Sequence, residues 1–78
     1  MAELQEILAN IARELVDDPE AVSVEQTGDG DDLTLVLNVA PDDMGKVIGR
    51  HGRIARSIRL VMKAAAGITG KRVTVDIR

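Results

Sequence analysis

Not one of the 78 residues in this chain is Phe, Trp, Tyr or Cys. A chain of this length buries only about 60% of the surface that it exposes when unfolded, so it depends on one small core. That core must be built from Ala, Val, Ile, Leu and Met, which together make up the 45% hydrophobic fraction. The sequence therefore predicts a single domain over residues 1–78 with an aliphatic core and no disulfide framework.

The same absences exclude several classes of function. Without cysteine there is no thiolate nucleophile and no zinc finger, and without aromatic residues there is no platform for stacking nucleic-acid bases. His51 is the only histidine, and its sequence neighbours do not suggest a catalytic arrangement. We therefore expect no enzyme activity, no cofactor and no metal site. The acidic N-terminus and the lack of a long apolar run predict a soluble cytoplasmic protein that does not enter a membrane.

Charge divides the chain into two parts, although the net charge is only −3. Residues 1–43 contain 12 acidic side chains and one basic side chain, Arg13. Residues 44–78 contain nine basic side chains and one acidic side chain, Asp76. A local basic face can bind phosphates whatever the net charge of the protein, but the two parts could equally neutralise each other in the fold.

Hydrophobic spacing and turn residues predict six regular elements. They are a helix over about 3–17, a strand over 21–26, a strand over 33–39, a short helix that starts at 41–43, a helix over about 53–66 and a strand over 71–78. The first two strands read as a hairpin around a turn at 27–32, and the segment Gly67–Gly70 reads as a helix cap and turn.

This order, α-β-β-α-α-β, predicts an α+β domain with a three-stranded mixed sheet packed against three helices. The last two strands are expected to run parallel, because two helices connect them. In the helix over 53–66, the predicted apolar stripe consists of Ile54, Ile58, Val61 and Ala65. The predicted inward positions of the sheet are Leu33, Leu35, Leu37, Val73, Val75 and Ile77.

Two glycines, Gly49 and Gly52, interrupt the chain between the two helices that follow the hairpin. Glycine lacks a Cβ atom, so another backbone can approach it closely. The helix that follows would point its free N–H groups and its positive dipole end at this loop. Arg50, Arg53 and Lys46 add positive charge. The pattern Gly-x-x-Gly alone is weak, but between two helices and beside a basic helix it indicates a site for consecutive phosphates of a single strand.

The segment Val47-Ile48-Gly49-Arg50-His51-Gly52-Arg53 resembles the signature of KH domains. The whole chain resembles a KH domain of the type II topology, and its length and acidic first helix are similar to those of the small bacterial stand-alone KH proteins of the KhpA family. The resemblance implies binding of about four nucleotides of single-stranded RNA in a groove, as a post-transcriptional regulator or RNA chaperone. It also implies a homodimer, a heterodimer with a larger KH-containing protein, or both.

The expected RNA-binding residues surround the loop. Gly49 and Gly52 would admit the RNA backbone, and Arg50 and His51 would face phosphates or solvent. The resemblance places Ile48 and Ile54 on the floor of the groove, where unstacked bases would rest on aliphatic side chains. The complete set is Lys46, Ile48, Gly49, Arg50, His51, Gly52, Arg53, Ile54 and Arg56.

Two alternatives remain open from the residues alone. The basic side chains of the helix over 53–66 could form an ordinary solvated face, and Lys71, Arg72 and Arg78 are expected to serve solubility rather than binding. The chain could also be an adaptor with a KH fold that dimerises and binds little RNA. Arg50 and His51 favour RNA binding, because an adaptor would have no need of a basic loop.

Overall fold

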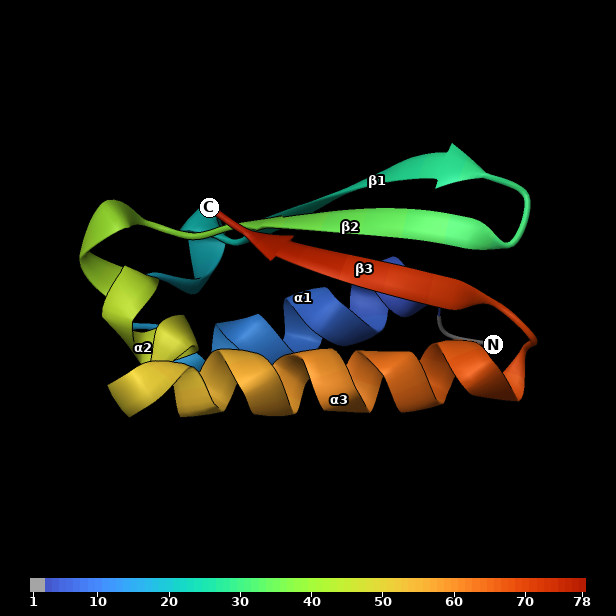
Figure 1. Ribbon diagram of the computed structural model, residues 1–78. Helices are drawn as coiled ribbons and strands as arrows, with labels where there is room; N and C mark the ends of the chain where they lie inside the picture. Colours follow the sequence, from blue (N-terminus) through green and yellow to red (C-terminus); the bar gives the residue numbers. More distant parts are fainter. Residues whose placement is uncertain (1–2) are drawn as a thin grey trace.

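In this computed structural model, which describes residues 3–78, three strands form one sheet, two long helices cover one of its faces, and a third, short helix lies at one end (Figure 1). Met1 and Ala2, the first residues of the expected domain, lie outside the described part. The elements are α1 (Leu4–Leu15), β1 (Ser23–Asp29), β2 (Asp32–Asn38), α2 (Met44–Ile48), α3 (Arg53–Ile68) and β3 (Arg72–Ile77). Their order and layers confirm the α+β fold expected of a type II KH domain.

The sheet has the order β1-β2-β3, with β2 in the centre. β2 pairs with β1 in antiparallel fashion and with β3 in parallel fashion, as predicted. Because α2 and α3 connect the parallel strands, α3 runs back beneath the sheet beside α1, while α2 lies at the end where β3 finishes (Figure 1). The junction between α2 and α3 is therefore held at one end of the molecule.

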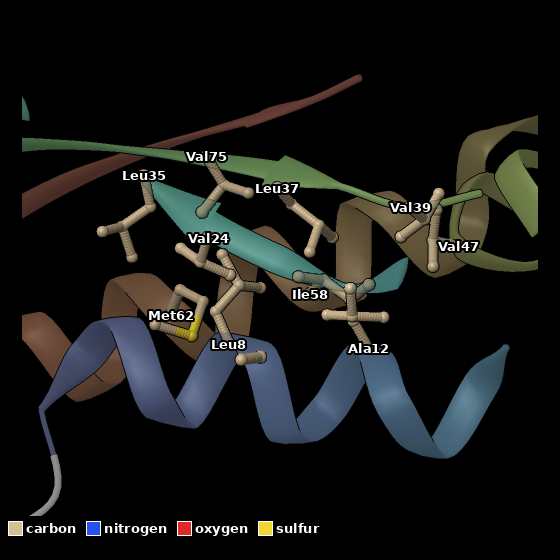
Figure 2. Packing of buried hydrophobic residues seen from close by; sticks show 12 residues of the cluster. Leu8, Ala12, Val24, Leu35, Leu37, Val39, Val47, Ile58, Met62 and Val75 are labelled. Atoms are coloured by element: carbon tan, nitrogen blue, oxygen red, sulfur yellow. The ribbon is translucent and has the colours of Figure 1, made fainter. Parts of the chain in front are cut away.

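The core lies between the sheet and the helix pair α1 and α3 and is built from aliphatic residues and methionine (Figure 2). Leu8 of α1 and Met62 of α3 point toward Leu35 and Leu37 of β2, and all four side chains are completely buried. Each fully buried side chain of this size contributes about 1.5–3 kcal/mol through removal of apolar surface from water. The aliphatic core expected from the composition is confirmed.

The apolar stripe predicted for α3 is partly wrong. Ile58 is buried as expected, but Val61 is 50% exposed and the neighbouring Met62 is fully buried. The buried face also includes Ala55 and Ala66. Both stripes have helical spacing, and the structure uses the one with alanines, whose small side chains let α3 approach the sheet closely.

The hairpin turn is tighter than predicted. The ladder between β1 and β2 continues to the pair Asp29 and Asp32, so only Gly30 and Asp31 remain in the turn. Gly28, predicted to be in the turn, is paired with Leu33 inside the ladder. Its φ is +115°, and a Cβ atom there would overlap the carbonyl oxygen of Asp32. The glycine marks a close approach of two strand backbones rather than the turn itself.

The cap predicted at Gly67–Gly70 is confirmed, although α3 continues two residues further than expected. Gly70 has a φ of +74°. The N–H of Gly70 donates to the carbonyl of Gly67 at 3.1 Å, and the N–H of Lys71 donates to that of Ala66 at 2.9 Å. These two bonds form a Schellman cap, which ends α3 and directs the chain into β3.

Candidate nucleic-acid interface

The loop Gly49–Gly52 joins α2 to α3 at the end of the molecule where β3 finishes (Figure 1). The N–H of Gly49 donates to the carbonyl of Gly45 at 2.9 Å and completes α2, and the N–H of Gly52 donates to the carbonyl of Gly49 at 3.1 Å. Gly49, His51 and Gly52 all have positive φ. Three residues with positive φ in a loop of four make a sharp reversal that brings the backbone of the loop next to the first turn of α3.

Gly49 is required by a contact inside the protein. Its φ and ψ of 76° and 173° are open to almost no residue except glycine. A Cβ atom at this position would also lie 2.6 Å from Cγ1 of Ile54, far inside van der Waals contact. Ile54 packs against the core, so this contact fixes the loop against the body of the domain.

Gly52 is different, because a Cβ atom there would meet no atom of the protein within 4 Å. Its φ of +72° still favours glycine, and the space beside it is open. His51 has a φ of 58° and an exposed side chain, and histidine is one of the residue types that tolerate this region. The second glycine therefore exposes its backbone to an approaching ligand.

Gly52 is also the N-cap of α3 and, having no side chain, leaves the first N–H groups of α3 without a side-chain acceptor. There is no acidic residue in the first turn of α3. The N–H of Arg53 donates to the carbonyl of Arg50, and the rest of the first turn and the positive end of the helix dipole face the loop without an acidic side chain.

The basic side chains expected at the site fall into two groups. Arg50, Arg53 and Arg56 are exposed, and within residues 3–78 none of them forms an ion pair. Lys46 is instead held by two carboxylates, with its Nζ 3.0 Å from Oδ2 of Asp17 and 3.5 Å from Oδ1 of Asp43. The positive charge that is free for a ligand comes from the arginines.

Asp43 is a buried carboxylate that sequence reasoning recognised only as part of a helix start. Its two oxygens accept the backbone N–H of Asp17 at 3.2 Å and of Asp18 at 3.0 Å, so it ties the segment after α1 to the start of α2. Only 3% of the surface of Asp43 is exposed to solvent. No local pattern predicts these contacts, because the partners are 25 and 26 residues away in sequence.

Asp43 and Lys46 are both stabilised in their ionised forms. Burial alone would raise the pKa of Asp43, but the hydrogen bonds from Asp18, Asp17 and Lys46 outweigh it and lower the pKa below 3.8. The pKa of Lys46 lies above its ordinary value, chiefly because of its hydrogen bond to Asp17. The cluster therefore holds α2 in place with its charges intact at neutral pH.

The two isoleucines beside the loop, Ile48 and Ile54, are half-buried. Together with the loop, they bring aliphatic surface close to exposed backbone and free arginines.

In the part of the chain that the structure describes, three or more potential metal ligands do not gather anywhere. None of the helices within residues 3–78 has the length and apolarity needed to cross a membrane.

Comparison with known proteins finds the same family over nearly the whole chain. A family profile described as "KhpA/KhpB, KH domain" matches residues 5–77. A protein of Clostridium acetobutylicum named "RNA-binding protein KhpA" is 50% identical over 74 residues, which cover 95% of this chain and 99% of that protein. Proteins with the same name are 50% identical in Caldanaerobacter subterraneus, over 92% of this chain and 96% of the relative, and 46% identical in Treponema pallidum, over 94% and 91%.

The two glycines of the loop should respond differently to alanine. Gly49→Ala combines backbone strain with a clash against Ile54, and we expect it to lower the free energy of unfolding by about 3 kcal/mol. Gly52→Ala carries only the strain of a left-handed alanine, about 1–2 kcal/mol. Urea denaturation measures both values. In an Ile54→Ala background, Gly49→Ala should cost less than it does in the wild type, because Cγ1 and Cδ1 of Ile54 are gone while its Cβ remains. Equal losses for the two glycines would contradict the close contact.

The Asp43 cluster predicts a specific acid sensitivity. Because the folded pKa of Asp43 is lowered, its stabilising effect is present above its ordinary pKa of 3.8 and is lost as the pH falls through the folded pKa. Asp43→Asn should lower the melting temperature at neutral pH and remove the part of the acid-induced loss that comes from protonation of Asp43. Asp42→Asn, at the exposed neighbour, serves as the control and should keep the wild-type melting temperature at neutral pH. An unchanged melting curve for Asp43→Asn at neutral pH would contradict a stabilising role for the hydrogen bonds that Asp43 accepts from Asp17 and Asp18.

Proposed function

The chain belongs to the KhpA/KhpB family of KH-domain proteins, and from this premise we propose that it binds single-stranded RNA beside the Gly49–Gly52 loop. The binding site would comprise the loop, the first turn of α3 and the flanking isoleucines. Binding of this kind would suit a post-transcriptional regulator or an RNA chaperone. The names of the curated relatives, which call them RNA-binding proteins, support the proposal.

The observation that carries the proposal is the exposed N-terminus of α3 beside an open glycine. The N–H groups of the first turn lack a side-chain cap, and no atom of the protein fills the space next to Gly52. A phosphate can reach such a helix end and accept hydrogen bonds from its backbone. The absence of a Cβ atom at Gly52 lets the phosphate come close to the main chain.

Electrostatics support the same placement. Arg50, Arg53 and Arg56 are exposed and free of ion pairs within the described residues, and guanidinium groups bind phosphate oxygens in a bidentate manner. His51 adds a donor at the tip of the loop. Lys46 contributes less, because a phosphate would have to compete with Asp17 for its ammonium group.

The aliphatic side chains support a preference for unpaired RNA. Ile48 and Ile54 can contact the faces of bases only if those bases are not stacked in a helix. Without an aromatic residue in the chain, stacking on a side-chain ring cannot contribute. The affinity of one such site for a short RNA is therefore expected to rest on phosphate contacts and aliphatic packing.

A second element of the proposal is pairing with another KH chain, and it rests on the outer face of α3. Leu60, Val61 and Ile68 are 68%, 50% and 87% exposed. Ile68 also lines a groove of about 400 Å³ together with Leu4, Ile7 and Leu33. Exposed apolar residues gathered on one helix indicate an interaction surface.

We propose that this face binds a second copy of the same chain. Each copy offers an acidic α1 and a basic α3, so two copies can approach with opposite charges facing each other. A heterodimer with a larger KH-containing protein would use the same face. If the chain pairs but binds no RNA, the adaptor function considered above replaces the RNA-binding function.

The loop is tested by the double substitution Arg50→Asp with His51→Asp. We expect the wild type to bind an unstructured oligonucleotide more tightly than an RNA duplex, and the variant to lose binding to both, because acids would face the phosphates. Aspartate tolerates the positive φ at position 51, so the loss should come without a change in melting temperature. Electrophoretic mobility shift and circular dichroism measure the two effects.

A matched control changes the charge by the same amount elsewhere. Asn10→Asp with Arg13→Asp places the acids on the exposed side of α1, where both side chains are solvent-accessible. This control should keep nearly all of the RNA affinity. Wild-type affinity in the loop variant would place the RNA contact elsewhere, and equal loss in both variants would mean that only the net charge matters.

The pairing face is tested by Leu60→Glu. We expect sedimentation in the micromolar range to show a dimer for the wild type and a monomer for the variant, because a charge at the contact would have to be desolvated. Thr27→Glu, at an exposed position of β1, is the control and should remain dimeric. A monomeric wild type would overturn the homodimer, and a dimeric Leu60→Glu would overturn the choice of face.

A further inference from the structure

A groove of about 510 Å³ lies between α1 and the strand β1. The residues that line it are Glu3, Gln5, Glu6, Ala9, Arg13 and Val24. It shares only Glu3 with the groove at Ile68 that belongs to the proposed pairing face. Ile7 in that groove and Ala9 in this one are two positions apart on α1, which is about 200° around the helix. The two grooves therefore lie on opposite sides of α1.

β1 forms one edge of the sheet, because β2 is its only neighbour within the described residues. In an antiparallel pair, every second residue turns its N–H and C=O away from the partner strand. Asp29 and Asp32 close the two-residue turn, and a pair in this position is hydrogen-bonded. Val24 lies an odd number of positions before Asp29, so Val24 and Gln26 belong to the residues that face the open edge.

A hydrogen bond supports this orientation of β1. The side-chain amide of Gln5 donates to the carbonyl of Val24, so this carbonyl faces α1 and accepts a donor from the groove. Within residues 3–78, it is the one edge-facing backbone group of Val24 and Gln26 that has a partner. The amide N–H of an added strand would make the same bond in place of Gln5.

The side chains around this edge are acidic. Glu3 and Glu6 are exposed, and neither forms an ion pair within the described residues. Arg13, the single basic residue among residues 1–43, lies two helical turns beyond Glu6 and donates to Oδ1 of Asn10 at 3.0 Å. The groove therefore offers two free carboxylates beside an open strand edge, which is complementary to a cationic chain.

We propose that this groove binds an extended basic segment of another protein, which adds to β1 as a fourth strand of the sheet. Its main chain would pair with Val24 and Gln26, and its lysine or arginine side chains would contact Glu3 and Glu6. An extended segment suits this groove better than a helix, because a helix has already used its N–H and C=O groups internally. The inference depends neither on RNA binding nor on pairing, since it uses the edge of the sheet opposite β3.

The test adds two capped hexapeptides to the full chain, one that alternates lysine with valine and one that alternates glutamate with valine. We expect the lysine peptide to bind and the glutamate peptide not to bind. Glu3→Lys with Glu6→Lys should weaken binding of the lysine peptide about tenfold, because two attractions become repulsions. A titration followed by NMR at physiological salt measures the affinities.

A matched control changes the net charge by the same amount outside the groove. Asp31→Lys with Asp42→Lys alters two exposed positions that do not line it. This control should bind the lysine peptide nearly as well as the wild type does. Equal weakening in the two variants would show that only the net charge matters and would overturn the proposal, as would a wild type that does not bind the lysine peptide.

Amide hydrogen exchange in the unaltered chain distinguishes strand addition from attraction between charges. With the lysine peptide bound, exchange should slow more at Val24 and Gln26 than at Glu25, whose N–H already faces β2. Because this readout needs no substitution, it holds even if the lysine variants are less stable. Binding that leaves exchange at Val24 and Gln26 unchanged, or slows it equally at Glu25, would overturn the added strand.

Discussion

The parallel pairing of β2 with β3 is the constraint on which the placement of the candidate site depends. Two parallel neighbours cannot be joined by a tight turn, so the chain must return along the full length of the sheet before β3 begins. α3 makes this return with 16 residues, which span about 24 Å. The reversal before it, at Gly49–Gly52, is thereby fixed at the end where β2 and β3 finish. The loop owes its position to the sheet and its sharp shape to the positive φ of Gly49, His51 and Gly52, and the close approach of Gly49 to Ile54 fixes it against the domain.

α3 has a buried side and an exposed side with different compositions. The buried side uses Ala55, Ile58, Met62 and Ala66 against the sheet. At the margin of the exposed side, Nε of Arg59 donates to a backbone carbonyl of β3. Leu60 is 68% exposed and lies within one turn of the basic residues Arg56 and Lys63, so apolar and basic side chains share the exposed side. A helix with a single role would be polar on every side that does not face the core.

Periodicity and glycine positions predicted the helices, the strands and the cap at Gly67–Gly70, because each of these is determined within a few consecutive residues. The parallel strand pair was predicted from the two helices that connect the strands. The side of α3 that faces the sheet could not be predicted in this way. The stripes through Val61 and through Met62 have the same helical spacing, and only the packed structure selects between them. The role of Asp43 could not be predicted from the sequence either, because it depends on backbone donors that are 25 and 26 residues away. Whether the predicted site residues bind RNA remains a prediction.

The acidic residues of the N-terminal part of the chain determine which surfaces of the molecule can attract a polyanion. A net charge of −3 and a pI near 5.0 give the molecule no general attraction for polyanions. At physiological ionic strength, exposed charges are screened over about 8 Å, whereas the molecule measures 34 × 25 × 20 Å. The carboxylates of α1 and of the hairpin tip therefore do not cancel the arginines at the far side of α3. They repel phosphates from their own surfaces, which agrees with the proposal that a nucleic-acid strand would approach the molecule at the Gly49–Gly52 loop.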